Sequence, residues 1–228
     1  MLDLSKSYEF FQPDKDDSMI HIVGCGSVGS TIAENLARCG VKRFTLWDFD
    51  NVEPHNVANQ MFTQNDIGRK KVEALQDIIM NINPDVEIKL KENGWNGEML
   101  SGYIFLAVDS IEIRKKIVEK MFNSVYVKAV FDVRTLLESA QHYAADWSDQ
   151  RMKQNLLNSM QFSHDEAKDD TPVSACGVTL GVATVVRIIS ALCVNNYINF
   201  VKGLGIKKFI QIDCFNFDLQ VFPRPEEN

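Results

Sequence analysis

The sequence lacks the patterns of several protein classes. Its five cysteines are scattered and form no CxxC pair, which excludes a zinc knuckle or ribbon built on such pairs. We therefore expect reduced thiols and no zinc. Acidic residues outnumber basic ones by 31 to 24, for a net charge of −7. The chain thus lacks the excess of basic residues that is typical of nucleic-acid-binding proteins, and we expect no nucleic-acid partner.

Long apolar runs are also absent. No segment approaches the roughly 18 uninterrupted apolar residues of a membrane span, so we expect no membrane partner. The segment Met1–Asp17 is acidic and polar and contains no apolar core, which argues against a signal peptide in it. These absences predict a cytoplasmic protein. With 228 residues, 45% of them hydrophobic, the chain can form one domain of generous size.

Apolar runs and amphipathic stretches alternate through the first half of the chain. We expect helices at residues 27–39, 69–82 and 111–122, and strands at residues 20–23, 44–47, 86–90, 103–108 and 125–130. This alternation predicts an α/β fold, a Rossmann-like and mostly parallel sheet with helices on both faces.

The pattern changes near residue 132 and predicts an antiparallel C-terminal part. We expect an antiparallel strand at residues 138–145, a short helix at 148–160, a long apolar helix at 177–194, and a hairpin of strands 208–213 and 217–222. No linker divides the chain, so residues 1–228 form a single domain. Within it we expect an N-terminal arm at residues 1–18 and a mobile, crossover-like loop at residues 146–175.

A glycine-rich motif lies between the first expected strand and helix. Gly24, Gly26 and Gly29 form a Gly-x-Gly-x-x-Gly pattern, and Ser27 begins the helix. Glycine lets a phosphate approach the backbone because no Cβ stands in the way. The alternative is a tight turn that only packs the helix on the strand. The position between strand and helix favours nucleotide binding.

Two carboxylates follow the second expected strand. Asp48 lies about twenty residues after the glycine motif, where dinucleotide folds place the carboxylate that binds ribose hydroxyls. A turn or helix-cap role is the alternative. Asp50 shares a face with Asp48 if the strand continues, and it contacts either the nucleotide or the neighbouring loop. NAD and ATP both fit this part of the pattern.

The segment after Asp50 is polar and rich in amides, with Asn56, Asn59 and Gln60 in it. A plain Rossmann dehydrogenase usually passes into its next helix here, so this segment disfavours an NAD-dependent oxidoreductase. The nearby aromatic side chains of Phe49 and Phe62 are interpreted as packing residues, although Phe62 could flank an adenine.

Several ordered motifs together resemble the ThiF/MoeB/HesA family of adenylyltransferases, which is also the adenylation module of ubiquitin-activating enzymes. The similar segments are Leu46–Gln60, Gly68–Val72, Asn83-Pro84, and Asp109 after a later strand. The resemblance covers about residues 19 to 145, and the apolar helix at 177–194 more loosely. It implies that the whole chain is one ThiF-like adenylation domain that uses ATP and Mg²⁺.

The resemblance also implies roles for individual residues. Lys71 would neutralise the ATP phosphates, and Asp109 would bind the magnesium ion. From the residues alone, Lys71 could instead be an exposed helix lysine, and Asp109 could cap the helix that starts at residue 111, a role that Ser110 could also fill. The candidate nucleotide-binding residues are Gly24, Gly26, Ser27, Gly29, Asp48, Asp50, Asn56, Asn59, Gln60 and Lys71.

Cys176 precedes the long apolar helix. Some relatives carry a cysteine near this position that accepts the activated acyl group as a thioester. A helix N-terminus lowers the pKa of a thiol and makes it nucleophilic. The alternative is a small packed residue at a helix start. With Lys71 and Asp109, Cys176 completes the set of candidate catalytic residues.

Three departures from the family pattern leave two functions open. Asn59 stands where the family has an arginine, no arginine precedes Arg38, and the zinc-binding cysteine pairs are missing. The resemblance implies a homodimer that adenylates the C-terminal carboxylate of a small ubiquitin-like protein or peptide. The alternative is a nucleotide-binding module with weak or no catalysis that recognises a partner.

Overall fold

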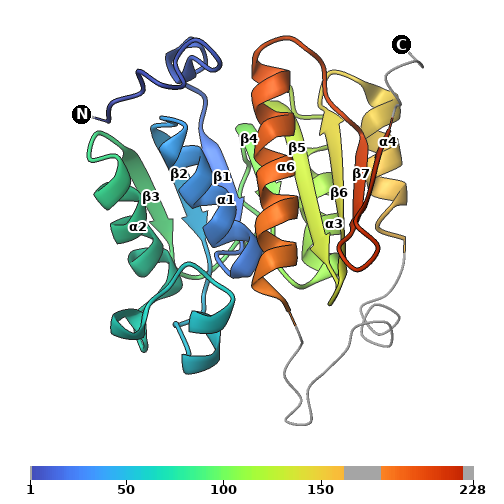
Figure 1. The fold of residues 1–228 in the computed structure, drawn as a ribbon. Helices are drawn as coiled ribbons and strands as arrows, with labels where there is room; N and C mark the ends of the chain where they lie inside the picture. Colours follow the sequence, from blue (N-terminus) through green and yellow to red (C-terminus); the bar gives the residue numbers. More distant parts are fainter. Residues whose placement is uncertain (1, 162–180, 223–228) are drawn as a thin grey trace.

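The computed structural model describes residues 2–161 and 181–222 and contains a sheet of eight strands (Figure 1). The strand order is β3-β2-β1-β4-β5-β6-β7-β8. The first five strands are parallel, and β6, β7 and β8 each pair antiparallel with the preceding strand. This confirms the expected α/β fold with an antiparallel C-terminal part.

The strands are β1 (Ile20–Val23), β2 (Arg43–Trp47), β3 (Glu87–Lys91), β4 (Gly102–Leu106), β5 (Val127–Thr135), β6 (Ser139–Asp146), β7 (Phe209–Asp213) and β8 (Asp218–Phe222). The described helices are α1 (Ser27–Arg38), α2 (Lys71–Ile82), α3 (Ile111–Met121), α4 (Gln150–Asn158) and α6 (Ala183–Val201), with short 3₁₀ turns η1 (Pro13–Lys15), η2 (Pro54–Ala58) and η3 (Gln64–Asp66).

Helices cover both faces of the sheet. Helices α1, α2 and α6 pack on one face, and α1 lies between the other two (Figure 1). Helices α3 and α4 pack together on the other face. Every residue of β1 and β4 is buried, because strands in the middle of a covered sheet are enclosed from both sides. Strand β3, at the edge, alternates between exposed and half-buried residues.

Some element boundaries differ from the sequence prediction. Helix α2 begins at Lys71 rather than at residue 69, because Lys70 has a non-helical ψ of 133° and forms an isolated antiparallel bridge with Asn51. Strand β5 runs on to Thr135, beyond the expected residue 130, because β6 pairs with its whole second half.

The region after β6 agrees with the prediction where the structure describes it. Helix α4 lies within the short helix expected at residues 148–160. Helix α6 overlaps the apolar helix expected at residues 177–194, but it begins only at Ala183, after the extended Val182, and continues to Val201. The part of the expected crossover-like loop from residue 162 to 175 lies outside the described residues.

Helix α6 is long and apolar enough to cross a membrane by length and composition alone. Half of its most apolar window is buried inside the fold, where it packs against α1 and the sheet. A core helix passes the same test, so this finding is weak evidence for a membrane span.

Candidate functional site

The carboxyl ends of β1 and β4 form the point where the order of the sheet reverses. From β1 the chain leads through α1 to β2, whereas β4 leads through α3 to β5 on the opposite side. Loops diverge at such a point and leave a crevice, which is the usual ligand site of open parallel sheets. The glycine motif follows β1, and Asp109 follows β4, so both lie at this edge.

The three motif glycines have different surroundings. Gly24 has a φ of +93°, and a Cβ on it would lie 2.7 Å from the backbone of Ala107 and Val108. A Cβ on Gly29 would lie 1.8 Å from the carbonyl oxygen of Gly24. These two glycines allow close packing of backbone on backbone. A Cβ on Gly26 would meet no atom within 4 Å, so Gly26 leaves open space at the start of α1.

The N-terminus of α1 has free hydrogen-bond donors. Its N-cap residue is Gly26, which has no side chain to accept from the helix. In the described parts of the chain, the backbone N–H groups from Gly26 to Gly29 donate to no acceptor. Unpaired N–H groups and the helix dipole attract anions. Together with the open space at Gly26, they fit a phosphate group.

Asp48 is connected directly to the glycine turn. Its Oδ2 accepts a hydrogen bond of 2.6 Å from the backbone N–H of Cys25, and its Oδ1 accepts one of 2.9 Å from that of Asp50. Burial raises the pKa of the Asp48 carboxyl, although these two N–H groups oppose the shift. The carboxylate is therefore held in a fixed orientation beside the glycine turn.

Lys71 is a buried lysine paired with Asp50. Its Nζ lies 2.9 Å from Oδ2 of Asp50, and only 8% of the residue is exposed. The interpretation as an exposed helix lysine is therefore wrong. Asp50 contacts the start of α2 through this pair. The neighbouring Lys70 donates to the backbone carbonyl of Phe49.

The three amides of the segment after Asp50 have different roles. Asn56 is buried and accepts a hydrogen bond of 2.9 Å from the backbone N–H of Glu53, which stabilises η2. The side-chain oxygens of Asn59 and Gln60 are buried and have no hydrogen-bond partner among the described residues. A buried acceptor without a donor is costly, so each of these two oxygens calls for a donor from outside the described residues.

Asp109 is exposed and belongs to no ion pair or hydrogen bond within the described residues. The hydroxyl of Ser110 accepts from the backbone N–H of Ile113, so Ser110 caps α3 and the cap interpretation of Asp109 is wrong. No group of three His, Cys, Asp or Glu residues in the described chain could hold a metal ion. A magnesium ion at Asp109 would therefore need phosphate oxygens as further ligands.

A buried guanidinium, not anticipated from the sequence, fixes the turn that carries Asp109. Arg114 on α3 donates from Nε to the carbonyl oxygen of Val108 at 2.7 Å and pairs with the fully buried Asp132. Arg134 also pairs with Asp132. Burial alone would raise the pKa of Asp132, but the two guanidinium groups lower it below its usual value. No sequence pattern distinguishes Arg114 from the other charged residues of α3.

The structure confirms the packing interpretation for Phe62 but contradicts it for Phe49. Phe62 is 3% exposed and belongs to the core, so it does not flank a ligand at the surface. Phe49 lies between Asp48 and Asp50 and is 63% exposed. Its ring lies close to the backbone of Gly94. Phe49 is therefore an exposed ring beside the candidate ribose ligand.

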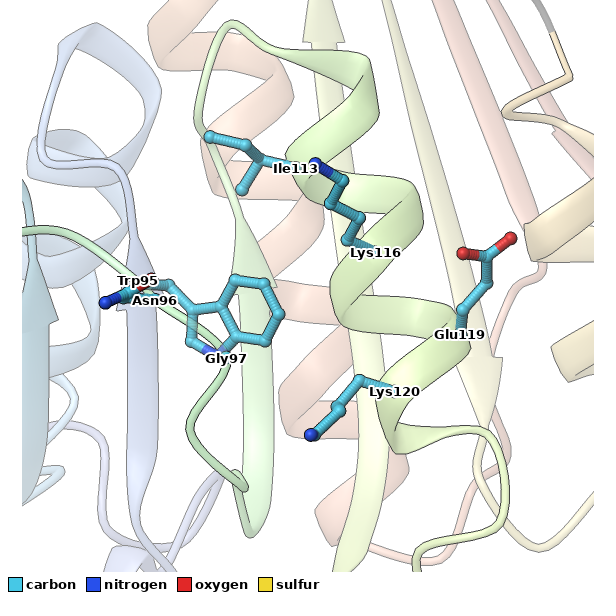
Figure 2. A pocket seen from close by; sticks show the side chains of 7 residues that line it. All are labelled: Trp95, Asn96, Gly97, Ile113, Lys116, Glu119 and Lys120. Carbon is cyan, nitrogen blue, oxygen red and sulfur yellow. The ribbon is translucent and has the colours of Figure 1, made fainter.

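A separate cavity of about 580 Å³ lies between the loop at Trp95 and helix α3 (Figure 2). The ring of Trp95 faces helix α3, and the side chains of Lys116 and Lys120 project from this helix (Figure 2). None of the residues predicted for the site lines this cavity. The candidate site is thus an open edge of the sheet rather than this hollow. Cys176 lies outside the described residues.

Comparison with known proteins agrees with this geometry. The model of the ThiF family matches residues 6–228. Ubiquitin-like modifier-activating enzyme 5 of Caenorhabditis briggsae is 42% identical over 74 residues, which is 32% of this chain and 17% of that protein. The same enzyme of Drosophila erecta is 40% identical over 89 residues, or 39% of this chain and 21% of that protein. The chain thus matches about a fifth of these relatives' length.

Two solved structures share the fold. Escherichia coli MccB, solved with ATP, has a TM-score of 0.72 and 17% identity, covering 92% of this chain and 64% of MccB. PaaA has a TM-score of 0.69 and 18% identity, covering 96% of this chain and 68% of PaaA. The family match extends over nearly the whole sequence and includes every element of the candidate site. The chain belongs to the ThiF family.

Proposed function

We propose that this chain adenylates a carboxylate with ATP. One observation carries the proposal: a continuous series of contacts connects the start of α1 to an ammonium group. The N–H of Cys25 binds Asp48, Asp48 binds the N–H of Asp50, and Asp50 pairs with Lys71. A phosphate-binding helix end, a fixed carboxylate and a buried cation are thereby held together at the crevice of the sheet.

This arrangement fits displacement at the α-phosphorus of ATP. A carboxylate oxygen attacks that phosphorus, the bond to the bridging oxygen of the β-phosphate breaks, and pyrophosphate leaves. Such a reaction requires positioning and positive charge directed at the phosphate oxygens. The free N–H groups of α1 and the Lys71 ammonium supply that charge, and Asp48 orients the ribose through its hydroxyls. A magnesium ion held by Asp109 would neutralise further phosphate charge.

The carboxylate in this proposal is the C-terminus of a small ubiquitin-like protein or peptide. The similar curated proteins are named as activating enzymes of a ubiquitin-like modifier, and one MccB structure contains MccA. After adenylation, the Cys176 thiolate would attack the acyl carbon and release AMP, forming a thioester. We further propose a cytoplasmic homodimer.

Pyrophosphate exchange tests the proposal. The protein is incubated with ATP, Mg²⁺, labelled pyrophosphate and candidate peptides that end in Gly-Gly. Peptide-dependent return of label to ATP is the expected result, because formation of an acyl adenylate is reversible. Absence of exchange with every candidate, together with absence of ATP binding, would contradict the proposal.

A second function is favoured by Asn59. An amide replaces the arginine that the family resemblance implies at this position, and an amide supplies no fixed positive charge. The chain would then be a nucleotide-binding module that recognises a partner without catalysis. Tight ATP binding without exchange supports this function. Stronger thermal stabilisation by NAD than by ATP would contradict both functions.

A further inference from the structure

Among the described residues, few cations lie at the candidate site, and Lys70 donates to the backbone carbonyl of Phe49. Asp48, Asp50 and Asp109 contribute negative charge at this edge, and the Lys71 ammonium already pairs with Asp50. ATP is itself strongly anionic, so the carboxylates repel it unless further positive charge is present. Asn59 and Gln60 contribute only amide groups. The site therefore calls for a second cation from another element.

Arg187 on α6 is a cation without a charged partner in the described residues. Its Nη1 lies 2.6 Å from Sδ of Met61, and the residue is exposed. A thioether is only a weak acceptor and carries no charge, so it does not satisfy a guanidinium group. Arginine remains protonated at any physiological pH. Within the described residues, Arg187 thus presents a positive charge with no charged partner beside the segment of Asn59 and Gln60.

Helix packing and Met61 place Arg187 near the start of α1. Helices α1 and α6 pack against each other and begin at the same edge of the sheet (Figure 1). The backbone N–H of Met61 donates to Oγ of Ser30 on α1. Ser30 lies one helical turn, or about 5 Å, beyond Gly26. The backbone of Met61 therefore lies about one turn from the free N–H groups of α1, and Arg187 contacts the side chain of this same residue.

The arrangement of elements indicates which phosphates Arg187 would meet. Asp48 follows β2 and fixes the ribose on the β2 side of the glycine turn. Helix α6 lies on the other side of α1, over β5 and β6. A phosphate chain that starts at this ribose and crosses the start of α1 therefore directs its end toward Arg187.

We propose that Arg187 binds the β- and γ-phosphates of ATP, the part that leaves as pyrophosphate. The inference rests on the proposed nucleotide site and adds a residue from a helix that contains none of the sequence-predicted ligands. The guanidinium leaves the thioether of Met61 and forms charge-assisted hydrogen bonds with phosphate oxygens. It supplies the positive charge that Asn59 cannot.

Binding of three ligands tests this role. Affinities for ATP, pyrophosphate and AMP are measured by calorimetry for the wild-type protein and for Arg187→Gln. We expect the variant to bind ATP and pyrophosphate about 10- to 100-fold more weakly, because charged hydrogen bonds are lost. AMP has no β- or γ-phosphate, so its affinity should stay within about twofold. Equal ATP and pyrophosphate affinities in variant and wild type would overturn the inference.

Further variants separate phosphate binding by Arg187 from a purely structural role of its side chain. Arg151 lies exposed on α4, on the opposite face of the sheet, and Arg151→Gln is the matched control, expected to bind all three ligands normally. Arg187→Lys should retain part of the ATP affinity. Adding Asn59→Arg to Arg187→Gln should restore ATP affinity, because position 59 lies in the segment that Arg187 contacts. The inference would be overturned if the double variant bound ATP as weakly as Arg187→Gln does. It would also be overturned if Arg187→Gln lost affinity for ATP and for AMP to the same extent.

The wild-type measurement distinguishes the two proposals. If the wild-type protein binds no ATP and no pyrophosphate, the nucleotide site itself is contradicted and the role of Arg187 fails with it. If the wild-type protein binds ATP and Arg187→Gln binds it with the same affinity, only the proposed role of Arg187 is contradicted.

Discussion

Nζ of Lys71 lies 2.9 Å from Oδ2 of Asp50, so the candidate catalytic ammonium is already paired before any nucleotide binds. The Asp50 side chain is half exposed, whereas that of Lys71 is only 10% exposed. ATP therefore competes with, or joins, a carboxylate that holds the lysine in place. This pairing keeps the ammonium directed at the edge of the sheet without a ligand.

Replacing Lys71 with alanine should remove catalysis and preserve the fold. The side chain acts on phosphate, and the carboxylate left behind at Asp50 is half exposed and can be hydrated. Loss of one preorganised charge typically lowers such a rate about 10²- to 10³-fold. The measurement is pyrophosphate exchange together with thermal unfolding. Lys120→Ala, an exposed change on α3, is the control and should leave exchange intact. Unchanged exchange in Lys71→Ala would refute the assigned role.

Alanine at Gly26 and at Gly29 should have opposite effects. Gly26→Ala places a methyl group in open space, so the protein should fold with an unchanged melting temperature but bind ATP weakly, because the methyl group occupies the phosphate position. Gly29→Ala forces a contact of 1.8 Å with the carbonyl oxygen of Gly24 and should destabilise the fold. Thermal melting with and without ATP measures both effects. Normal ATP stabilisation of Gly26→Ala would show that the phosphate lies elsewhere.

Phe49→Ala should weaken binding of ATP and AMP equally. An exposed ring beside the candidate ribose ligand can stack on the base, and such stacking is worth about 1–3 kcal/mol per base. Both nucleotides carry the same base, so calorimetry should show the same loss for each, unlike the Arg187 variant. Phe10→Ala, which removes an exposed ring on the N-terminal arm, is the control. A loss for ATP alone would exclude stacking on Phe49.

Stability should fall as the pH falls from about 6.5 to about 4. Burial lowers the pKa of His142 from 6.5 to about 4, and His21 behaves similarly. A histidine kept neutral in the fold binds its proton more readily in the unfolded chain, so the unfolded state takes up more protons in this pH range. The free energy of unfolding in urea, measured at several pH values, should show this decrease.

His142→Gln should lower the number of protons taken up on unfolding in this pH range by about one, which makes the free energy of unfolding less dependent on pH. In the wild type, Nδ1 of His142 lies 3.2 Å from the carbonyl oxygen of Asp132, and Nε2 lies 3.0 Å from Nδ2 of Asn196. His55→Gln, a change at a half-exposed histidine, is the control for replacing an imidazole outside the core. An unchanged slope in His142→Gln would mean that His142 is protonated in the fold.

Much of the fold could be predicted from the sequence because local patterns determine it. Buried strands appear as continuous apolar runs, and α1 begins within the glycine motif, directly after Gly26. The position of Asp48 after β2 follows from the same alternation. Local patterns could not distinguish the open space at Gly26 from the close backbone packing at Gly24 and Gly29, because the sequence shows only a glycine at each of the three positions.

The surroundings of the side chains were decided only by the tertiary structure. Sequence patterns predicted packing for both Phe49 and Phe62, whereas the fold buries Phe62 and exposes Phe49. Met61 and Arg187 are 126 positions apart and meet because α1 packs against α6. Sequence by itself determined which segments form strands and helices, since hydrophobic periodicity is local. Burial and charge pairing required the folded protein, since they depend on segments that are distant along the chain.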